Sequence, residues 1–489
     1  MKPSLQVLSE REEQQIIQEA IGLLDKPGII INNGEVLALL EAAGGRTDRD
    51  KQVVSIPEEL IADALTTCPQ VFSLYNLKGE KAVNYGISET YFNPGSSTLY
   101  ILDSQSQKAR LAETPDLVQF IKLVETLPQI DAQSTAFVSS DVPENIKDLY
   151  RLYLALHFMT KPVITGIFRK ESWGVMKDLL STAAGGDQAL DDKPLGIFDI
   201  CPTSPLRWSD ISSQNILDNA RSGIPMQIVA MPMAGATSPV TLAGTIVQHT
   251  AECLSGIVIA QLARRGAKVV WGGSAAVFDM KSSTAPMGAP GTWLIAAAYA
   301  QIGKGLGLPT QAYLGISDAK IVDAQAGMES AAGALLGSLA GVNMISGAGM
   351  LAYENCQSPE KLILDAELIG AIKHFSRGIQ FREDPLALEV VREVGFSSDF
   401  ISHEHTLNWF KKEGHYPSAV FDRRPLDPGD QPDPRTAWNR AQDRMEDLIQ
   451  SYAGPALPAE VQSELKRITA SAARVAGMDH LPALPDHSF

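Results

Sequence analysis

Short apolar runs alternate with amphipathic or small-residue runs along most of this chain, from about residue 115 onward. The apolar runs have the length of strands and lack an alternating polar face, which is typical of strands buried in a parallel sheet. The runs between them are long enough to be helical crossovers. The predicted strands are Asp131–Ser139, Pro162–Phe168, Leu195–Cys201, Pro225–Met231, Ala267–Trp271, Pro309–Leu314 and Gly341–Ile345.

Repeated strand–helix units of this kind favour a closed (β/α)8 TIM barrel, predicted over residues 115–424, over an open doubly wound sheet. No GxGxxG motif follows an early strand, which also argues against a Rossmann-type sheet. The eighth strand is expected either after Ala352 or from the N-terminal region.

The segments on either side of the predicted barrel lack its alternation of strands and helices. Residues 1–114 form an N-terminal extension, with helices expected at 9–27 and 57–67 and an antiparallel β region at 71–110. Ser9 and Glu12 have the spacing of a capping box for the first helix. Residues 425–489 open with a proline-rich stretch and continue with helices near 436–452 and 458–476, which we interpret as a C-terminal helical cap.

The charge balance narrows the choice of partners. Net charge is −16, with 57 acidic and 41 basic residues, which argues against nucleic acids and anionic membranes but does not oppose a cationic ligand. The 4 cysteines form no CxxC motif, which fits a reducing compartment. The polar N-terminus and the interrupted apolar stretches show no signal peptide or membrane span. A cytoplasmic location is therefore expected.

Two acids follow the predicted strand that ends at Leu314, in the position where functional groups of a barrel gather. Asp318 and Asp323 have no histidine, cysteine or arginine close by in sequence. Asp323 has the position of a helix cap and Asp318 that of a loop-stabilising group. The functional alternative is that one or both face a cation, whereas Glu329 is more typical of a helix face.

Aromatic and small residues near strand ends extend this hypothesis. The stretch YFNPGSSTLYIL, residues 91–102, reads as a hairpin that packs on the core or as a lid over a pocket. Small residues in SGAGML, residues 346–351, allow either close helix packing or room for a ligand. The candidates for substrate binding are the aromatic residues Tyr91, Tyr100, Trp271 and Tyr313 and the small residues Gly347 and Ala348. For each aromatic side chain, simple packing in the core is the alternative.

Motifs for nucleophilic or metal-dependent catalysis are missing from the sequence. His403 and His405 form an HxH pair without an evident third ligand, so capping or packing is the simpler interpretation. The sequence contains no HExxH, GxSxG or P-loop motif, and no DxHxxG stretch of the type that supplies a histidine to cobalt. We therefore expect no acid, base or nucleophile in catalysis and no metal bound by this chain.

Several segments together resemble the trimethylamine methyltransferase family: YFNPGSSTLYILD, IDAQSTAFVSSDVP, SDAKIVDAQAGMES with AGVNMISGAGML, and SHEHTLNWF with GHYPSAVFDRR. The resemblance covers nearly the whole chain. It implies a (β/α)8 enzyme that passes a methyl group from a methylated amine to reduced cobalt. The cobalamin would be carried by a separate corrinoid protein. A homo-oligomer is also expected.

One departure from the family pattern bears on the substrate. Archaeal members that act on trimethylamine carry pyrrolysine near the stretch matching residues 346–350, whereas ordinary residues occupy that stretch here. Members without pyrrolysine are similar to enzymes that demethylate quaternary amines. Glycine betaine is therefore the first substrate expected, with proline betaine or carnitine as alternatives. An uncharged or tertiary-amine donor and a non-catalytic methylated-amine-binding barrel are the rival interpretations.

A quaternary amine also suits the lack of catalytic motifs. Its nitrogen already bears the positive charge and leaves as a neutral amine, so no proton donor is needed. The protein must mainly hold and orient the substrate, with carboxylates and aromatic faces around the cation. The carboxylate of a betaine would need donors, for which Asn93, Arg169 or the amides near Gly347 are candidates.

Overall fold

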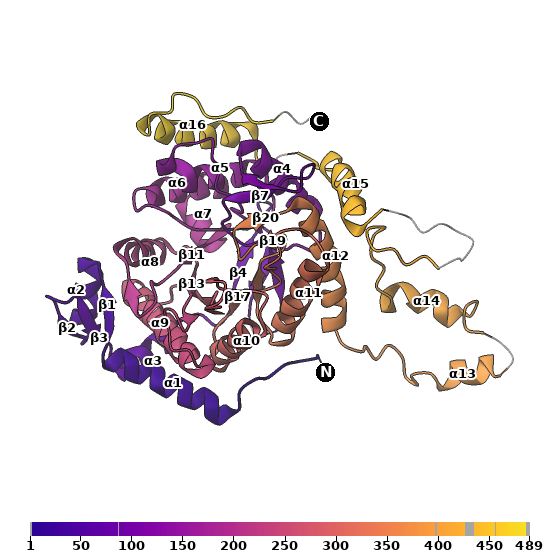
Figure 1. Cartoon of the computed structure of the whole chain (residues 1–489), viewed down its shortest axis with the longest axis horizontal. Coiled ribbons are helices and arrows are strands. Elements are labelled where there is room, and N and C mark those ends of the chain that lie inside the picture. Colours follow the sequence, from indigo (N-terminus) through magenta and orange to yellow (C-terminus); the bar gives the residue numbers. More distant parts are fainter. Residues whose placement is uncertain (1, 87, 397–398, 426–434, 455, 486–489) are drawn as a thin grey trace.

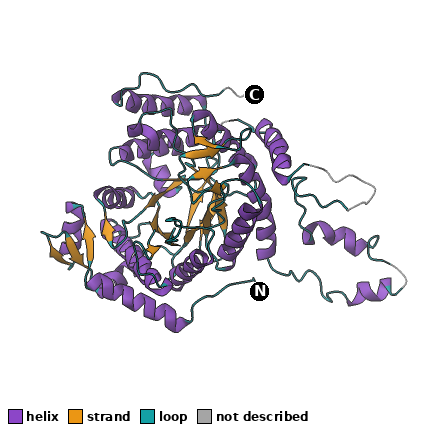
Figure 2. Ribbon diagram, viewed as in Figure 1, coloured by secondary structure: helices purple, strands orange, loops and turns teal. Residues whose placement is uncertain are grey.

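The computed structural model describes residues 2–86, 88–396, 399–425, 435–454 and 456–485. Its fold is mixed α/β, with helices arranged around a central group of strands (Figures 1 and 2). An arm that carries two short helices projects from one side of this body (Figure 1).

Parallel strands form the centre in two hydrogen-bonded sheets. The larger sheet has the order β15-β13-β11-β10-β9, and the smaller sheet has the order β17-β18-β6. Each of the seven predicted runs overlaps one of these strands, and β6 comes from the N-terminal region. The bounds are β6 (Tyr91–Asn93), β9 (Gln133–Ser134), β10 (Val163–Thr165), β11 (Gly196–Ile200), β13 (Met226–Ala230), β15 (Val269–Gly273), β17 (Gln311–Tyr313) and β18 (Met344–Ser346).

The two sheets are linked to each other at both pairs of edges. Trp271 of β15 forms a parallel bridge with Thr310, just before β17. At the other edges, the Asp131 amide donates to the Phe92 carbonyl at 2.9 Å. The strand β6 was expected in an antiparallel hairpin, and this expectation is wrong. Its neighbours are β18 and residue 131, because the buried Phe92 packs into the core beside them.

A helix follows each of these parallel strands and covers the sheet from outside (Figure 1). Two shorter helices, η1 (Glu144–Ile146) and α7 (Asp187–Asp192), lie in the connections. The covering helices are α4 (Thr114–Thr126), α5 (Lys147–Phe158), α6 (Ser172–Ala184), α8 (Asp210–Ser222), α9 (Leu242–Ala263), α10 (Pro290–Gly305), α11 (Ala324–Leu339) and α12 (Pro359–Ser376).

The helix α9 is apolar and long enough, by composition alone, to cross a membrane, and it is the one helix among the described residues with this property. Most of it, 78% of the apolar window, is buried inside the molecule. It lies between α1 (Glu10–Asp25), α8 and α10, as expected of a core helix.

An antiparallel hairpin closes the amino end of the parallel strands. It consists of β4 (Phe72–Tyr75) and β5 (Lys81–Tyr85), and its buried side chains form one apolar cluster with residues at the starts of the parallel strands. Because the strands are parallel, the opposite end of the sheet is formed by their carboxyl ends. The cluster comprises Phe72, Leu74, Val83, Tyr85, Ala132, Ile164, Ile197, Val270 and Met344.

The remaining elements surround this centre. The capping box of Ser9 and Glu12 starts α1, as predicted. A four-stranded sheet has the order β12-β1-β3-β2, and a second one has the order β19-β20-β7-β8. The bounds are β1 (Ile29–Ile31), α2 (Gly34–Ala42), β2 (Arg46–Asp48), β3 (Val53–Ser55), α3 (Glu58–Thr67), β7 (Tyr100–Leu102), β8 (Ala109–Leu111), β12 (Arg207–Trp208), β14 (Met233–Ala234), β16 (Ala276–Val277), β19 (Met350–Leu351) and β20 (Cys356–Gln357).

The C-terminal part carries four helices: α13 (Leu388–Val394), α14 (Glu404–Glu413), α15 (Ala437–Gln450) and α16 (Ala459–Val475). The last two confirm the helices predicted near 436–452 and 458–476. They pack on the body, α15 against α12 and α4, and α16 against α6 and α5 (Figure 1).

Candidate functional site

A cavity of about 370 Å³ lies at the carboxyl ends of the parallel strands. Its walls come from the ends of β10, β11, β13 and β17, from the loop after β6, from α5, and from the turn between β19 and β20. The lining residues are Ser96, Ser97, Arg151, Gly166, Ile167, Phe168, Asp199, Cys201, Val229, Met231, Tyr313, Tyr353, Glu354 and Asn355.

Asp199 is held in the cavity wall by neutral donors. It lies within the otherwise apolar strand β11, and its two carboxylate oxygens accept from the Gln227 side chain at 2.6 Å and the Tyr313 hydroxyl at 3.3 Å. Burial raises the pKa of Asp199 to about 6, although these hydrogen bonds lower it. Asp199 is therefore mostly charged at neutral pH, but it takes up a proton at a much higher pH than an ordinary aspartate does.

Glu354 supplies a second carboxyl group from a strained turn. Three successive residues, Ala352, Tyr353 and Glu354, have φ values of 51°, 58° and 68°. This left-handed region costs side-chain-bearing residues roughly 1 to 2 kcal/mol each, and such strain is found at functional sites. The Ser274 hydroxyl donates to Glu354 at 2.6 Å, and burial raises the pKa of Glu354 to about 7.

Arg151 brings a buried positive charge to the same cavity. Its guanidinium group donates to the carbonyls of Thr135 at 3.1 Å and Gly166 at 2.8 Å, and it stacks on the Phe168 ring at 4.3 Å. Burial lowers the pKa of Arg151 to about 10. The charges of Asp148 and Asp199 act on it from nearby, but its Nε atom has no hydrogen-bond partner in the described part of the chain. A buried guanidinium with spare donors is poised for an anionic ligand group.

The cavity has no obvious nucleophile. Cys201 lines it, but burial raises the pKa of its thiol to about 12, so the thiolate is scarce at neutral pH. Across the described residues, no group of three or more histidine, cysteine, aspartate or glutamate side chains is arranged to hold a metal ion. What the cavity offers is aromatic walls from Phe168, Tyr313 and Tyr353 beside both signs of charge. It can bind and orient a small charged molecule.

Of the predicted site residues, Tyr313 lines this cavity directly. Three others, Asn93, Gly347 and Ala348, contact one another next to the loop that forms one wall of it. The Asn93 carbonyl accepts from the amides of Gly347 and Ala348 at 3.0 and 3.2 Å, so these amides are already engaged. Gly347 has a φ of 142°, and a Cβ there would lie 2.3 Å from the Ile316 side chain. Its smallness therefore serves close packing.

Neither predicted acid lines this cavity, and Asp323 instead lines a separate cavity between α11, α12 and α15. Asp318 is buried and accepts from the amides of Met287 at 2.8 Å and Gly288 at 3.0 Å, while burial raises its pKa. Asp323 is the N-cap of α11 and accepts from the Ala326 amide. Both follow the structural alternative that the sequence left open.

The remaining aromatic candidates lie elsewhere. Trp271 is fully buried and donates to the Tyr299 carbonyl of α10 at 2.9 Å, so it points outward toward the helices. Its neighbour Val270 points inward, and side chains alternate along a strand. Tyr100 is exposed on β7, which pairs with β20 and β8. Their positions give no support to a substrate-binding role.

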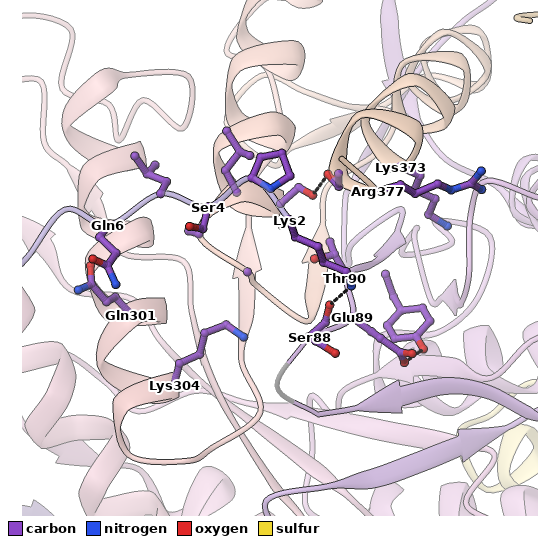
Figure 3. A pocket seen from close by; sticks show the side chains of 18 of the residues that line it. Lys2, Ser4, Gln6, Ser88, Glu89, Thr90, Gln301, Lys304, Lys373 and Arg377 are labelled. Carbon is purple, nitrogen blue, oxygen red and sulfur yellow. Dashed lines mark hydrogen bonds between the residues drawn. The ribbon is translucent and has the colours of Figure 1, made fainter. Parts of the chain in front are cut away.

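Tyr91 lines a different cavity, of about 750 Å³, near the N-terminal tail (Figure 3). Lys2, Lys304 and Arg377 also surround this space. Its cations are partly matched by acids, since Lys373 binds both Asp131 oxygens at 2.7 Å. It also lies at the amino end of β6, away from the Tyr313 cavity.

Two other residues considered from the sequence have local roles. Arg169 is exposed and pairs with Glu171 at 3.4 Å. His403 caps α14 and accepts from the His405 amide, in agreement with the capping interpretation.

Sequence reasoning missed three groups in the cavity. Asp199 carried a readable signal, because an acid inside the apolar run GIFDI must be satisfied or functional. Arg151 carried a weaker signal, as a base within the apolar face of a helix. Glu354 carried none, because its place depends on the left-handed turn.

Similarity to known proteins places the chain in a family. The family model described as trimethylamine methyltransferase (MTTB) matches residues 1–477. The trimethylamine methyltransferase MttB of Desulfitobacterium hafniense is 30% identical over 460 residues, which are 94% of this chain and 92% of that protein. A glycine betaine methyltransferase of the same species is 29% identical over 97% of this chain and 98% of that protein.

A crystal structure of the Methanosarcina barkeri monomethylamine methyltransferase MtmB aligns with a TM-score of 0.48 and 12% identity, over 89% of this chain and 92% of that chain. The match of residues 1–477 to the family model confirms the resemblance seen in the sequence. This chain belongs to the trimethylamine methyltransferase family and is a methyltransferase.

Proposed function

We propose that this enzyme transfers a methyl group from a betaine, a quaternary amine that also bears a carboxylate, to a corrinoid carried by a separate protein. Glycine betaine is the first substrate we propose, with proline betaine and carnitine as alternatives. The observation that carries the proposal is that one small cavity holds two carboxyl groups, three aromatic rings and a buried guanidinium group whose Nε atom has no hydrogen-bond partner. A betaine is a zwitterion: its quaternary nitrogen suits the rings and carboxyl groups, and its carboxylate suits the guanidinium group.

The quaternary nitrogen is proposed to lie between Tyr313, Asp199 and Glu354. An aromatic face contributes about 0.5 to 2 kcal/mol to binding a cation, and more when water is excluded. The pKa values of about 6 and about 7 mean that the two carboxyl groups share less than two full charges at neutral pH. This restraint suits the reaction, because the substrate cation becomes neutral as its methyl group leaves. Strong ion pairs would favour the substrate over the transition state.

The substrate carboxylate is proposed to bind Arg151. Two of its N–H groups are used by backbone carbonyls, and the planar guanidinium is fixed on the Phe168 ring. A carboxylate in this position would add a direct ion pair and a partner for the unused Nε donor. It would also fix the orientation of the substrate, so that one N-methyl group faces the cavity opening.

The size of the cavity supports a separate carrier for the corrinoid. A volume of about 370 Å³ is near the lower end of small-molecule sites. It fits a betaine, whereas a corrin ring is far larger. The corrinoid supplies the methyl acceptor when its carrier protein docks, and the residues of this chain bind and orient the donor.

The strand connections support a closed (β/α)8 barrel as the framework of the site. The two parallel sheets hold eight strands in the described residues, and hydrogen bonds or bridges join their edges at both sides. A helix follows each strand, and the cavity lies at the carboxyl ends, where barrel enzymes place their sites. A cytoplasmic location also remains part of the proposal.

A donor screen with free cob(I)alamin tests the function. We expect the cob(I)alamin absorbance to be lost with a betaine but not with choline, which keeps the quaternary nitrogen and lacks the carboxylate. Turnover of trimethylamine alone would contradict the proposal, and it is the strongest rival, because trimethylamine methyltransferases are among the relatives. Tight betaine binding without methyl transfer would instead indicate a non-catalytic binding protein, and turnover of an uncharged donor would indicate another substrate class.

A further inference from the structure

A long arm leaves the body after α12 and returns before α15 (Figure 1). It spans residues 377–425 and contains α13 and α14. Figure 1 shows the arm beyond α12, away from the helices that surround the strands. Near its base, the Ser418 amide donates to Glu367 of α12 at 3.0 Å.

The arm exposes an unusual amount of apolar surface. About half of the large apolar side chains exposed across the described residues lie between residues 375 and 416, with Ile379 87%, Phe381 80% and Ile401 80% exposed. The helix α14 buries none of its residues, and α13 buries Val394 alone. Burying one such side chain contributes about 1.5 to 3 kcal/mol, and contiguous exposed apolar surface marks an interaction site.

Polar contacts hold the arm in shape without covering this surface. Arg382 and Glu413 form an ion pair at 2.6 Å. Glu383 accepts from the Trp409 indole at 2.5 Å and lies 3.3 Å from His405. These contacts tie α14 to the segment before α13. The arm is therefore preorganised for binding, with its apolar side chains directed outward.

We propose that this arm packs on a second copy of the chain, with the two arms exchanged across a two-fold axis. Surfaces this apolar are typical of permanent subunit interfaces. A carrier protein that must dissociate in every catalytic cycle is better served by a smaller and more polar contact. The same chain also offers a receiving surface, as a two-fold interface requires.

The receiving surface is an apolar cavity of about 760 Å³ between α11, α12 and α15. Leu364, Leu368, Phe421 and Trp438 are among the residues that line it. It lies at the base of the arm, because α12 precedes the arm and Phe421 belongs to it. Two copies can therefore meet base to base, each arm reaching the cavity of the other.

The distribution of charge also favours contact between copies at the arm. The chain carries a net charge of −16, so two copies repel each other over most of their surfaces. Residues 377–425 contain 7 lysines and arginines against 8 acidic residues, which leaves the arm almost neutral. Association through this segment brings together the least repulsive part of each chain.

Light scattering coupled to size-exclusion chromatography tests the proposal on the full chain. We expect wild type to be a dimer or a larger even-numbered oligomer, and the triple variant Phe381→Asp, Ile401→Asp, Leu407→Asp to be a monomer. Betaine turnover with free cob(I)alamin should stay within about twofold of wild type, because the arm lies outside the cavity. The matched control is Val475→Asp on α16, whose side chain is 90% exposed and outside the arm.

Three results would overturn the proposal: a monomeric wild type at micromolar concentrations, an arm variant with the wild-type mass, or a control variant that dissociates as the arm variant does. If the arm variant does not fold, hydrogen exchange of wild type decides. Amides of α13 and α14 should become protected as concentration rises. Protection that requires the corrinoid protein would assign the arm to that partner. Because these measurements do not depend on methyl transfer, they separate this proposal from the proposed function.

Discussion

The Tyr313 hydroxyl lies 3.3 Å from Asp199 Oδ2 and 2.9 Å from the Ser96 carbonyl oxygen. One side chain at the end of β17 thus links the carboxyl end of β11 to the loop after β6. Ala312 packs outward in the main core, so the alternation of the strand turns the Tyr313 ring inward to the cavity. The ring and the hydroxyl consequently have separable functions in the proposed site.

Removal of the hydroxyl alone is therefore informative. Tyr313→Phe keeps the aromatic wall but deletes the one hydroxyl hydrogen that Asp199 and the Ser96 carbonyl share, so the pKa of Asp199 should rise further. We expect kcat/KM for glycine betaine to fall roughly 10- to 150-fold, as for the loss of one hydrogen bond to a charged group. Tyr313→Ala should cost more, because the ring is lost as well. Steady-state kinetics with cob(I)alamin would check both, and equal effects of the two substitutions would contradict a role for the ring.

Arg151 is predicted to distinguish betaines from simple quaternary amines. Arg151→Lys keeps a positive charge but loses the planar fork and the stacking on Phe168. We expect KM for glycine betaine to rise at least tenfold, as for the loss of a charge-assisted hydrogen bond, while kcat changes less. Because Arg151 is buried, thermal unfolding must show that the variant is folded. An unchanged KM in a folded variant would remove the proposed carboxylate site.

The sequence predicted the framework better than the site, for physical reasons. Strands buried on both faces leave continuous apolar runs, so seven of the strands were visible, whereas β6 has three residues within a polar stretch. Tyr313 ends β17, whereas Trp271, predicted at a strand end, lies in the middle of β15. The direction of a side chain depends on register, which the apolar runs do not define. Glu354 reaches the cavity through a left-handed turn that contains no glycine, so the sequence does not predict it.

Substrate affinity should depend on pH because the carboxyl groups that face the cation titrate near neutrality. The pKa of Asp199 is about 6 and that of Glu354 about 7, and ionisation of either strengthens attraction to a quaternary nitrogen. Affinity for glycine betaine should therefore rise as pH increases through 6 and 7, with protons released on binding. Calorimetry in buffers of different ionisation enthalpy would measure both. Glu354→Gln should remove the upper part of this dependence, and a pH-independent affinity in wild type would count against the site.

Asp318 is predicted to support the loop of Met287 and Gly288 without binding substrate. Asp318→Asn keeps one acceptor oxygen of the two that these amides now use. We expect a loss of roughly 1 kcal/mol in the free energy of unfolding and little change in KM for glycine betaine. Chemical denaturation and steady-state kinetics would check this. A large rise in KM with normal stability would restore Asp318 to the substrate site, as first predicted from the sequence.

Stability should also change with pH, in the opposite direction to affinity. Asp199 and Glu354 have pKa values of about 6 and about 7 in the folded chain, above their ordinary values of 3.8 and 4.5. Between the ordinary and the folded pKa of each group, the folded state therefore binds more protons than the unfolded state. The stability that the neutral groups contribute is fully present below pH 3.8 and is lost as pH rises through 6 and 7.

Glu354→Gln removes the cost of ionising this group in the cavity. The variant should be more stable than wild type above pH 7, by roughly 1 to 3 kcal/mol, and the difference should shrink toward pH 4.5. Urea denaturation across this range measures the difference, with the exposed Glu446→Gln on α15 as control. The gain should coincide with weaker betaine binding, because the same carboxyl group that destabilises the empty cavity attracts the cation. A variant that lost both stability and affinity would instead show that the hydrogen bond from Ser274 dominates at this position.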